Sequence, residues 1–280
     1  MIKKTVVAWD GSEGAAAALD WALARPSTEE LVLVHVDNAV ALAETFAANS
    51  TAAAARITLM EKADSVRRGQ PDRIVHSELV QGDPAVTLAG FASATSLVVL
   101  GTRGSTARKT RRSWSLGGRV AGLAAGPVAV VPVQADRSGT SIVVGVDDPE
   151  EAAVLFAAEE AARTGATLRP IRAWQVGPPW PGQTETDSAY LESLAEMYRD
   201  LVDDSLATVL ERYPDVVIEP AIVQGNPVEV LIDASAGARM LVVGNRGFRG
   251  LKRFFLGSVS HAVLLSTVVP TVVVNARRAG

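Results

Sequence analysis

A glycine-rich segment near the C-terminus contains the residues best suited to binding an anion. Gly244, Gly247, Gly257 and Ser258 stand in the spacing Gly-x2-Gly-x9-Gly-Ser. The first two glycines allow the backbone to turn sharply and to approach a ligand where a Cβ atom would clash. Four basic residues lie in the same segment, namely Arg246, Arg249, Lys252 and Arg253. This concentration of positive charge, on a chain whose net charge is −4, suits a polyphosphate.

A helix is predicted directly after this segment, over residues 258–265. The unpaired N–H groups and the positive dipole end at its N-terminus favour an anion. Ser258 can cap this helix or donate its hydroxyl to a phosphate. A glycine pair after a strand can equally form only a turn, and a basic loop can be a solvated surface, so both interpretations stay open here.

The same pattern occurs earlier in the chain with one departure. Gly101, Gly104 and Ser115 match, but Trp114 stands where the third glycine is expected. A tryptophan at a helix start, where the backbone must approach phosphate, is expected to obstruct the site. This segment is still more basic and contains Arg103, Arg108, Lys109, Arg111 and Arg112. A basic run can also bind nucleic acid, although Trp114 is the only aromatic residue near it that could stack on a base.

These two segments belong to two copies of one longer unit. Three segments recur in order: 6–10 as 143–147, 80–84 as 223–227, and 99–104 as 242–247. A repeat of about 140 residues indicates duplication of a whole domain, because solenoid repeats are much shorter. We therefore predict two nucleotide-binding domains, residues 1–137 and 138–280, joined by a short polar segment.

Each copy alternates apolar runs with segments of helical composition. The runs are rich in valine and nearly continuous, as in parallel strands that are buried on both faces. They cover residues 5–9, 31–36, 73–80, 97–100 and 128–133 in the first copy, and 142–146, 168–173, 216–223, 240–243 and 271–274 in the second. Stretches such as 14–24 and 51–68 are long enough for crossover helices. The pattern predicts an α/β fold of two tandem doubly wound domains, each a five-stranded parallel sheet with helices on both faces.

In such sheets a ligand lies beyond the carboxyl ends of the strands, where the strand order reverses. Two parts of each copy reach that place: the glycine-rich loop after the fourth strand, and Asp10 or Asp147 at the end of the first. These aspartates could face a ligand or a metal ion bound to it, and they equally suit a turn or a helix cap. Pro84 and Pro227 fit the first turn of a helix better than a ligand contact.

Composition excludes several classes of protein. The chain has 280 residues and no cysteine, which excludes disulfides, thiolate metal sites and a cysteine nucleophile. Its three histidines lack a metal-binding spacing, so no metal site is expected. No apolar run approaches the roughly 18 residues of a membrane span, and the N-terminus lacks the pattern of a signal peptide. We expect a cytoplasmic protein without membrane contact, and the mildly acidic balance disfavours nucleic-acid binding.

Three motifs in register resemble the universal stress protein family in its tandem-domain form. They are Asp10-Gly11-Ser12 after the first strand, Val-Gln-Gly-Asp/Asn-Pro in the middle of each copy, and Gly-x2-Gly-x9-Gly-Ser near the end. The resemblance covers essentially the whole length. It implies a five-stranded α/β fold, ATP as the bound nucleotide with or without Mg²⁺, a cytoplasmic stress-related regulatory role, and dimerisation through the last strand.

The resemblance also implies nucleotide contacts at matching positions of both copies. In the second copy the phosphate and ribose contacts fall on Gly244, Gly247, Gly257, Ser258, Val259 and Ser260, and the base-side contacts on Gly145, Asp147, Ala173 and Val243. In the first copy the corresponding residues are Ala8, Asp10, Val36, Leu100, Gly101, Gly104 and Ser115. The second copy lacks the Asp-Gly-Ser sequence, and the first copy has Trp114. We expect nucleotide binding in the second copy, and the first copy stays open.

Two classes of function remain open at this point. The leading hypothesis is a regulatory protein whose ATP-bound state is recognised by an unidentified protein partner. The alternative is a slow ATPase or a nucleotidyl-transfer enzyme on the same fold. We assign no catalytic residue, because the chain has no GxxxxGK[ST] loop and no constellation around a nucleophile. The apolar last strands need partners at their edges, so the two copies can pair with each other and can associate further into a homodimer.

Overall fold

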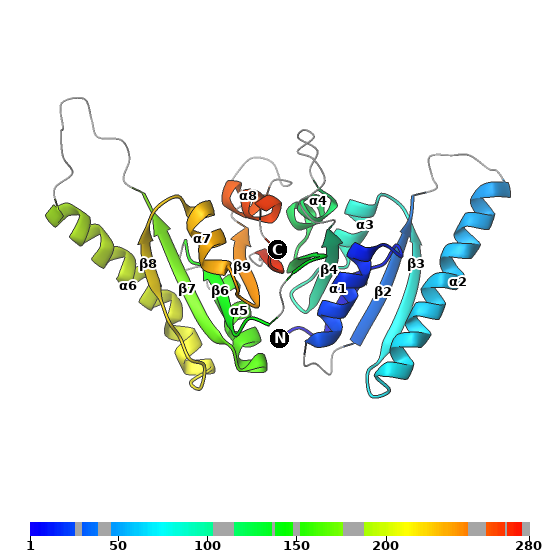
Figure 1. Cartoon of the computed structure of the whole chain (residues 1–280), viewed down its shortest axis with the longest axis horizontal. Helices are drawn as coiled ribbons and strands as arrows, with labels where there is room; N and C mark the ends of the chain where they lie inside the picture. The colour runs from blue at the N-terminus through cyan, green and yellow to red at the C-terminus, as the bar shows by residue number, and fades with distance from the viewer. Residues whose placement is uncertain are drawn as a thin grey trace, which may run out of the picture.

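The computed structural model describes residues 1–25, 30–38, 46–102, 115–135, 138–147, 152–175, 188–245, 256–266 and 268–275 (Figure 1). Within these residues one sheet of ten strands runs through both copies. The first copy contributes β1 (Lys4–Ala8), β2 (Glu30–Asp37), β3 (Val75–Gln81), β4 (Ser96–Thr102) and β5 (Val128–Pro132). The second copy contributes β6 (Ser141–Gly145), β7 (Thr167–Trp174), β8 (Ala221–Gln224), β9 (Met240–Asn245) and β10 (Thr271–Asn275).

The strand order is β3-β2-β1-β4-β5-β10-β9-β6-β7-β8. All pairs within a copy are parallel, whereas β5 and β10 pair antiparallel in the middle of the sheet. Thr271 faces Val130 and Val273 faces Val128 across this central pair. The prediction that the two last strands satisfy each other within one chain is therefore confirmed.

Helices cover both faces of the sheet, as the sequence predicted. They are α1 (Glu13–Ala24), α2 (Phe46–Gly69), α3 (Pro84–Gly90), α4 (Leu116–Leu123), α5 (Ala152–Thr164), α6 (Ser188–Arg212), α7 (Pro227–Ser235) and α8 (Ser258–Ser266). In Figure 1, α2 and α6 lie at the two outer ends of the molecule, and α4 and α8 lie next to each other near its centre. None of the helices in the described segments is long and apolar enough to cross a membrane.

Two apolar cores run along the two faces of the sheet and continue from one copy into the other. Neighbouring strand residues alternate between them, so Val7 packs in the core that contains Trp21 of α1 and Phe156 of α5. Val6 packs in the opposite core, which also contains residues of α3, α4, α7 and α8 such as Leu231. The inner strands that are buried on both faces, such as β4 and β5, are therefore continuous apolar runs.

Most predicted elements are confirmed, and one strand is wrong in extent. Residues 216–223 were expected to form one strand, but β8 covers only Ala221–Gln224. The preceding residues form a single bridge, in which the N–H of Leu168 donates to Val217 and that of Glu219 donates to Leu168. The next donor in this ladder would be the N–H of residue 170 of β7. That residue is Pro170, which has no N–H, so the regular strand begins only beyond this point.

The expectation that Pro84 and Pro227 begin helices is confirmed. Each proline is the first residue of its helix, α3 or α7, and the preceding side chain caps it. Asp83 accepts hydrogen bonds from the N–H groups of Ala85 and Val86, and Asn226 accepts one from Val228. Proline suits this position because its missing N–H would have no partner there in any case.

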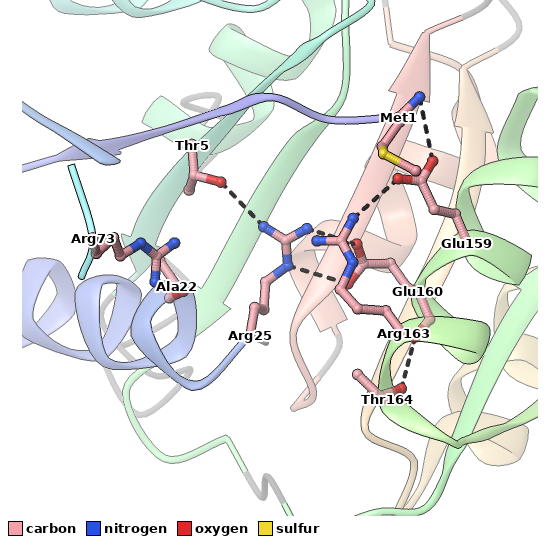
Figure 2. A network of polar contacts seen from close by, with 9 residues as sticks. All are labelled: Met1, Thr5, Ala22, Arg25, Arg73, Glu159, Glu160, Arg163 and Thr164. Carbon is pink, nitrogen blue, oxygen red and sulfur yellow. Dashed lines mark hydrogen bonds and ion pairs between the residues drawn. The ribbon is translucent and has the colours of Figure 1, made fainter. Parts of the chain in front are cut away.

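A buried ion pair joins the two copies near the central strands (Figure 2). Arg25 follows α1 in the first copy, and Glu160 lies on α5 in the second. Two nitrogens of the Arg25 guanidinium donate to the Glu160 carboxylate at 2.6 and 3.1 Å, and both side chains are at most 3% exposed. A third guanidinium nitrogen donates to the Thr5 hydroxyl at 3.2 Å. Arg163 approaches Glu160 from the solvent side at 3.5 Å.

Candidate functional site

The strand order reverses between β1 and β4 in the first copy and between β6 and β9 in the second. At such places the loops leave the carboxyl ends of two neighbouring strands in opposite directions and leave a crevice. The predicted site residues lie at or beside these strand ends: Ala8, Val36 and Gly101 in the first copy, and Gly145, Ala173 and Gly244 in the second. Both groups are therefore placed where a doubly wound sheet binds ligands.

In the second copy, hydrogen bonds hold the two ends of the glycine-rich loop together. Asn245 is the last residue of β9, and its Oδ1 accepts a hydrogen bond from the N–H of Gly257 at 3.0 Å. Ser260 is buried, and its hydroxyl donates to the carbonyl of Gly244 at 2.7 Å. The end of β9 and the start of α8 are thereby fixed next to each other.

Helix α8 begins at this junction and presents its N-terminus at the carboxyl edge of the sheet. The carbonyl of Gly257 accepts the first intrahelical hydrogen bond, from His261 at 2.9 Å. The N–H groups of Ser258, Val259 and Ser260 precede that bond, so the helix itself gives them no acceptor. With the helix dipole they form a positive end that suits a phosphate. Ser258 is exposed there, whereas Val259 packs partly against the core.

On the base side of the second copy, Asp147 is paired with an arginine from the neighbouring strand. The Arg172 guanidinium donates to Oδ1 of Asp147 at 2.5 Å and also to the backbone carbonyls of Val146 and Asp147. The ring of Tyr198 on α6 covers the guanidinium, whose carbon lies 4.7 Å from the ring centroid. Asp147 is 64% exposed and Arg172 only 12%, so the carboxylate remains accessible while its charge is compensated from below.

Two of the expected base-side residues have side chains that are buried beneath the edge. Val243 and Leu100 are 3% and 2% exposed, and their side chains belong to the core under the edge. Ala173 and Val36 are half-buried at the ends of β7 and β2. Of these four residues, only Ala173 and Val36 therefore have side chains that are partly exposed at the edge.

In the first copy, the matching glycine is required for packing. A Cβ atom on Gly101 would lie 1.7 Å from the carbonyl oxygen of Gly14, at the start of α1. A Cβ atom on Gly244 would have as its nearest neighbour the Cβ of Ala153 at 3.9 Å, which is an ordinary contact. The glycine of the first copy therefore lets α1 approach β4, and the glycine of the second copy is exposed without such a constraint.

The polar site residues of the first copy stabilise local structure. Ser115 is the N-cap of α4, where its hydroxyl accepts from the N–H of Gly118 at 3.2 Å. Asp10 accepts from the N–H of Ser12 at 3.0 Å, and the hydroxyl of Ser12 in turn caps α1. For Asp10, the turn alternative describes the observed contact. Ser115 forms the cap that was considered for its counterpart, Ser258.

Some predicted residues lie outside the described part of the chain. They are Gly104, Gly247 and Trp114, together with Arg103, Arg108, Lys109, Arg111, Arg112, Arg246, Arg249, Lys252 and Arg253. Of the second-copy residues expected to contact a nucleotide, those around β6, β9 and α8 lie in the described part of the chain. The exposed Gly244 and the three N–H groups that begin α8 suit a phosphate group, so these residues fit such a ligand.

The model of the universal stress protein family matches residues 1–132 and 140–275. The two matches cover both copies. The chain belongs to the universal stress protein family. The predicted boundary between residues 137 and 138 stays a prediction, since it falls between the two matches and residues 136 and 137 are outside the described part.

Comparisons with individual universal stress proteins agree in sequence and in fold. Universal stress protein Rv2005c of Mycobacterium tuberculosis is 34% identical over 207 residues, which cover 71% of this chain and 68% of that protein. The crystal structure of a universal stress protein from Archaeoglobus fulgidus shares the fold, with a TM-score of 0.67, 18% identity and 98% of each chain covered. A shorter family member from A. fulgidus, covering 49% of this chain and 98% of its own, was solved in complex with dAMP (20% identity, TM-score 0.35).

Sequence reasoning missed three residues that shape the second-copy edge of this universal stress protein: Asn245, Asn275 and Arg172. Asn245 stands inside the glycine motif but was not assigned a role, and Asn275 follows an apolar strand without any motif. Arg172 had a usable signal, because it is a charged residue inside a predicted buried strand and next to the expected contact Ala173.

Proposed function

We propose that this universal stress protein binds an adenine nucleotide, with ATP as the physiological ligand, at the carboxyl edge of β6 and β9. The observation that supports this most is the arrangement around α8. An exposed glycine at the end of β9 lies beside a helix N-terminus whose first three N–H groups have no acceptor within the helix. In a protein of this family, that arrangement is best explained as a phosphate site.

The remaining residues have defined roles in this proposal. Ser258 adds a hydroxyl donor beside the phosphate, and Gly145 and Ala173 allow the base to lie close to the strand ends. Asp147 accepts a hydrogen bond from the base, while Arg172 holds its carboxylate in place. Because Asp147 is already paired with Arg172, it is poorly suited to bind Mg²⁺ as a catalytic ligand. This favours nucleotide binding over hydrolysis.

The biological role that follows is regulatory. A nucleotide that binds one conformation better than another shifts the population toward it, and a protein partner can then recognise that conformation. We place this activity in the cytoplasm, in the response to stress, and we keep a homodimer as the expected assembly. Since β5 and β10 pair within the chain, such a dimer needs a surface other than these two strands.

The test is native mass spectrometry of protein purified without added nucleotide, followed by identification of any released ligand and by titration with Mg-ATP. The informative variant is Gly257→Trp, which places at the second-copy position the residue that the first copy has. The matched control is Gly90→Trp, because Gly90 is exposed and a Cβ atom there meets nothing within 4 Å. Gly244→Ala tests the same site from the strand side.

One ATP per chain in the wild type and in Gly90→Trp, lost in Gly257→Trp, would support the second-copy site. Two per chain that fall to one would support nucleotide binding and show that the first copy also binds, despite Trp114. No nucleotide in the purified wild type and no binding on titration would overturn the proposal.

A further inference from the structure

A chain of side-chain amides links the proposed nucleotide site to the first copy. Asn275 is the last residue of β10, and its Nδ2 donates to the carbonyl oxygens of Ala121 at 3.3 Å and Gly126 at 3.0 Å. Its Oδ1 accepts a hydrogen bond from Nδ2 of Asn245 at 2.6 Å, and Oδ1 of Asn245 accepts from the N–H of Gly257. We call Asn245 and Asn275 the amide relay.

The amide relay is satisfied in only one orientation. Carbonyl oxygens can only accept, so Asn275 must present its NH2 group to Ala121 and Gly126. Its oxygen then faces Asn245, which must present its own NH2 group and leaves its oxygen for the N–H of Gly257. Carbonyls of the first copy therefore determine which group faces the start of α8 in the second copy.

The first-copy end of the relay is a helix terminus. Ala121 lies in the last turn of α4, where the carbonyl oxygens have no N–H donor left within the helix. Gly126 lies in the turn before β5. Asn275 therefore caps the C-terminal end of α4 from the other copy. Helices α4 and α8 are neighbours in the structure, so the path is short (Figure 1).

This link runs in one direction only. The positions of the first copy that match Asn245 and Asn275 in the repeat are Thr102 and Pro132. A proline has neither a polar side chain nor a backbone N–H, so β5 cannot offer α8 an equivalent amide. The loop ends of the second copy depend on the first copy, and the described residues Thr102 and Pro132 form no matching amide relay in reverse.

We propose that Asn275 is a positioning residue through which the end of α4 sets the geometry of the second-copy nucleotide site, so that nucleotide binding at α8 changes the stability of α4. The inference rests on the proposed function of that site. A phosphate bound at the N–H groups that begin α8 favours the arrangement in which Asn245 holds Gly257. It thereby also favours the arrangement in which Asn275 holds Ala121 and Gly126. Because linkage is reciprocal, loosening α4 must lower the nucleotide affinity by the same factor.

The experiment combines Mg-ATP titration with amide hydrogen exchange of the full-length protein, read out by mass spectrometry. Peptides that cover residues 116–126 report on α4, and peptides that cover residues 256–266 report on Gly257 and α8. Asn275→Asp breaks the first-copy end of the relay, because a carboxylate cannot donate to the carbonyl oxygens of Ala121 and Gly126. Its negative charge also faces these oxygens. Asn245→Ala removes the relay without adding charge. The matched control is Asn226→Asp, which changes the same residue type at the cap of α7, where the first copy already has Asp83.

The expected result has two parts. Without nucleotide, both relay variants exchange at least fivefold faster than the wild type in both peptides, and Asn226→Asp does not. With Mg-ATP, the wild type alters the exchange of residues 116–126, whereas the relay variants bind ATP at least tenfold more weakly and show no such change. ATP affinity within twofold of the wild type in both relay variants, or unchanged exchange of Gly257 in them, would overturn the relay.

Failure of the proposed function has a different signature. If the wild type binds no ATP but the relay variants still exchange faster at both peptides, the nucleotide site is wrong and the positioning of Gly257 by Asn275 is supported. If the wild type binds ATP while α4 exchange is unaffected by ATP in every protein, the nucleotide site is supported and the coupling is overturned.

Discussion

The two copies form the same carboxyl edge with different interactions. In the first copy, Gly101 is packed against Gly14 and Ser115 is occupied in capping α4. In the second copy, Gly244 and Ser258 are exposed, and Asn245 holds the loop ends together instead. The same residue types thus serve packing in one copy and are available at the surface in the other.

A second difference lies at the end of the first strand of each copy. In both, the strand after it provides a side chain that binds the backbone there: His35 Nδ1 donates to the carbonyl of Trp9 at 2.8 Å, and Arg172 donates to that of Val146 at 3.2 Å. Only the arginine is long enough to reach the aspartate as well, so Asp147 is paired and Asp10 serves the turn. A shared motif therefore identifies the place of a site without showing which copy keeps it available.

The largest effect is expected where the two copies meet. Glu160→Met leaves the Arg25 guanidinium buried without its carboxylate and is expected to lower the free energy of unfolding by about 3–5 kcal/mol. Arg25→Met combined with Glu160→Met removes both charges and should recover most of that loss, because two apolar side chains of similar volume can replace a buried pair. Urea unfolding measures both variants. A double variant as unstable as the single one would contradict this account.

The two matching glycines should respond very differently to one added methyl group. Gly101→Ala forces apart β4 and the start of α1 and is expected to cost about 1–3 kcal/mol of unfolding free energy. Gly244→Ala meets only an ordinary contact and should stay within about 0.5 kcal/mol of the wild type. Thermal and urea unfolding compare the two, and ATP titration of Gly244→Ala should show weaker binding. Equal destabilisation would remove the distinction between the copies.

The two matching serines provide a subtler comparison. Ser115→Ala removes the N-cap of α4 and is expected to cost about 1 kcal/mol of stability. Ser258→Ala should change stability by less than about 0.5 kcal/mol, as for other exposed substitutions, and weaken ATP binding. Unfolding curves and ATP titrations of both variants are the measurements. A stable Ser115→Ala together with an unstable Ser258→Ala would exchange the roles that we assign.

The smallest expected effect is a pH dependence of stability that comes from Asp83, the cap of α3. At the matching position, the cap of α7, the second copy has Asn226. The N–H of Val86, followed by the Arg119 guanidinium, holds the pKa of Asp83 below its ordinary value. Its contribution to stability is therefore present above the pKa of the unfolded chain, about 3.9, and is lost as the pH falls through the lower folded pKa. Asp83→Asn copies the second copy and should remove this dependence.

The measurement is the thermal unfolding midpoint of wild type and Asp83→Asn between about pH 6 and pH 2. The two proteins should differ by a constant amount down to about pH 4 and converge below it, as Asp83 becomes protonated. Curves that stay parallel through the acid range would show that Asp83 does not contribute in this way.

Much of the fold could be predicted because its determinants are local or repeated. Parallel strands buried on both faces leave continuous apolar runs, and a proline after Asp83 or Asn226 marks the start of a helix. The repeated segments identified the duplication and the family. The expected extent of β8 was wrong because an apolar run does not show that the missing N–H of Pro170, in the neighbouring strand β7, interrupts the ladder.

The sequence by itself therefore determined the two copies, their α/β plan and the edge at which we propose that a ligand binds. The tertiary structure decided which residues at that edge are available. Arg25 meets Glu160 across a separation of 135 positions and Asn275 reaches Ala121 across 154, from strands and helices of different copies. No local pattern encodes such pairs, because they arise only when β5 and β10 pair antiparallel and bring the two copies together.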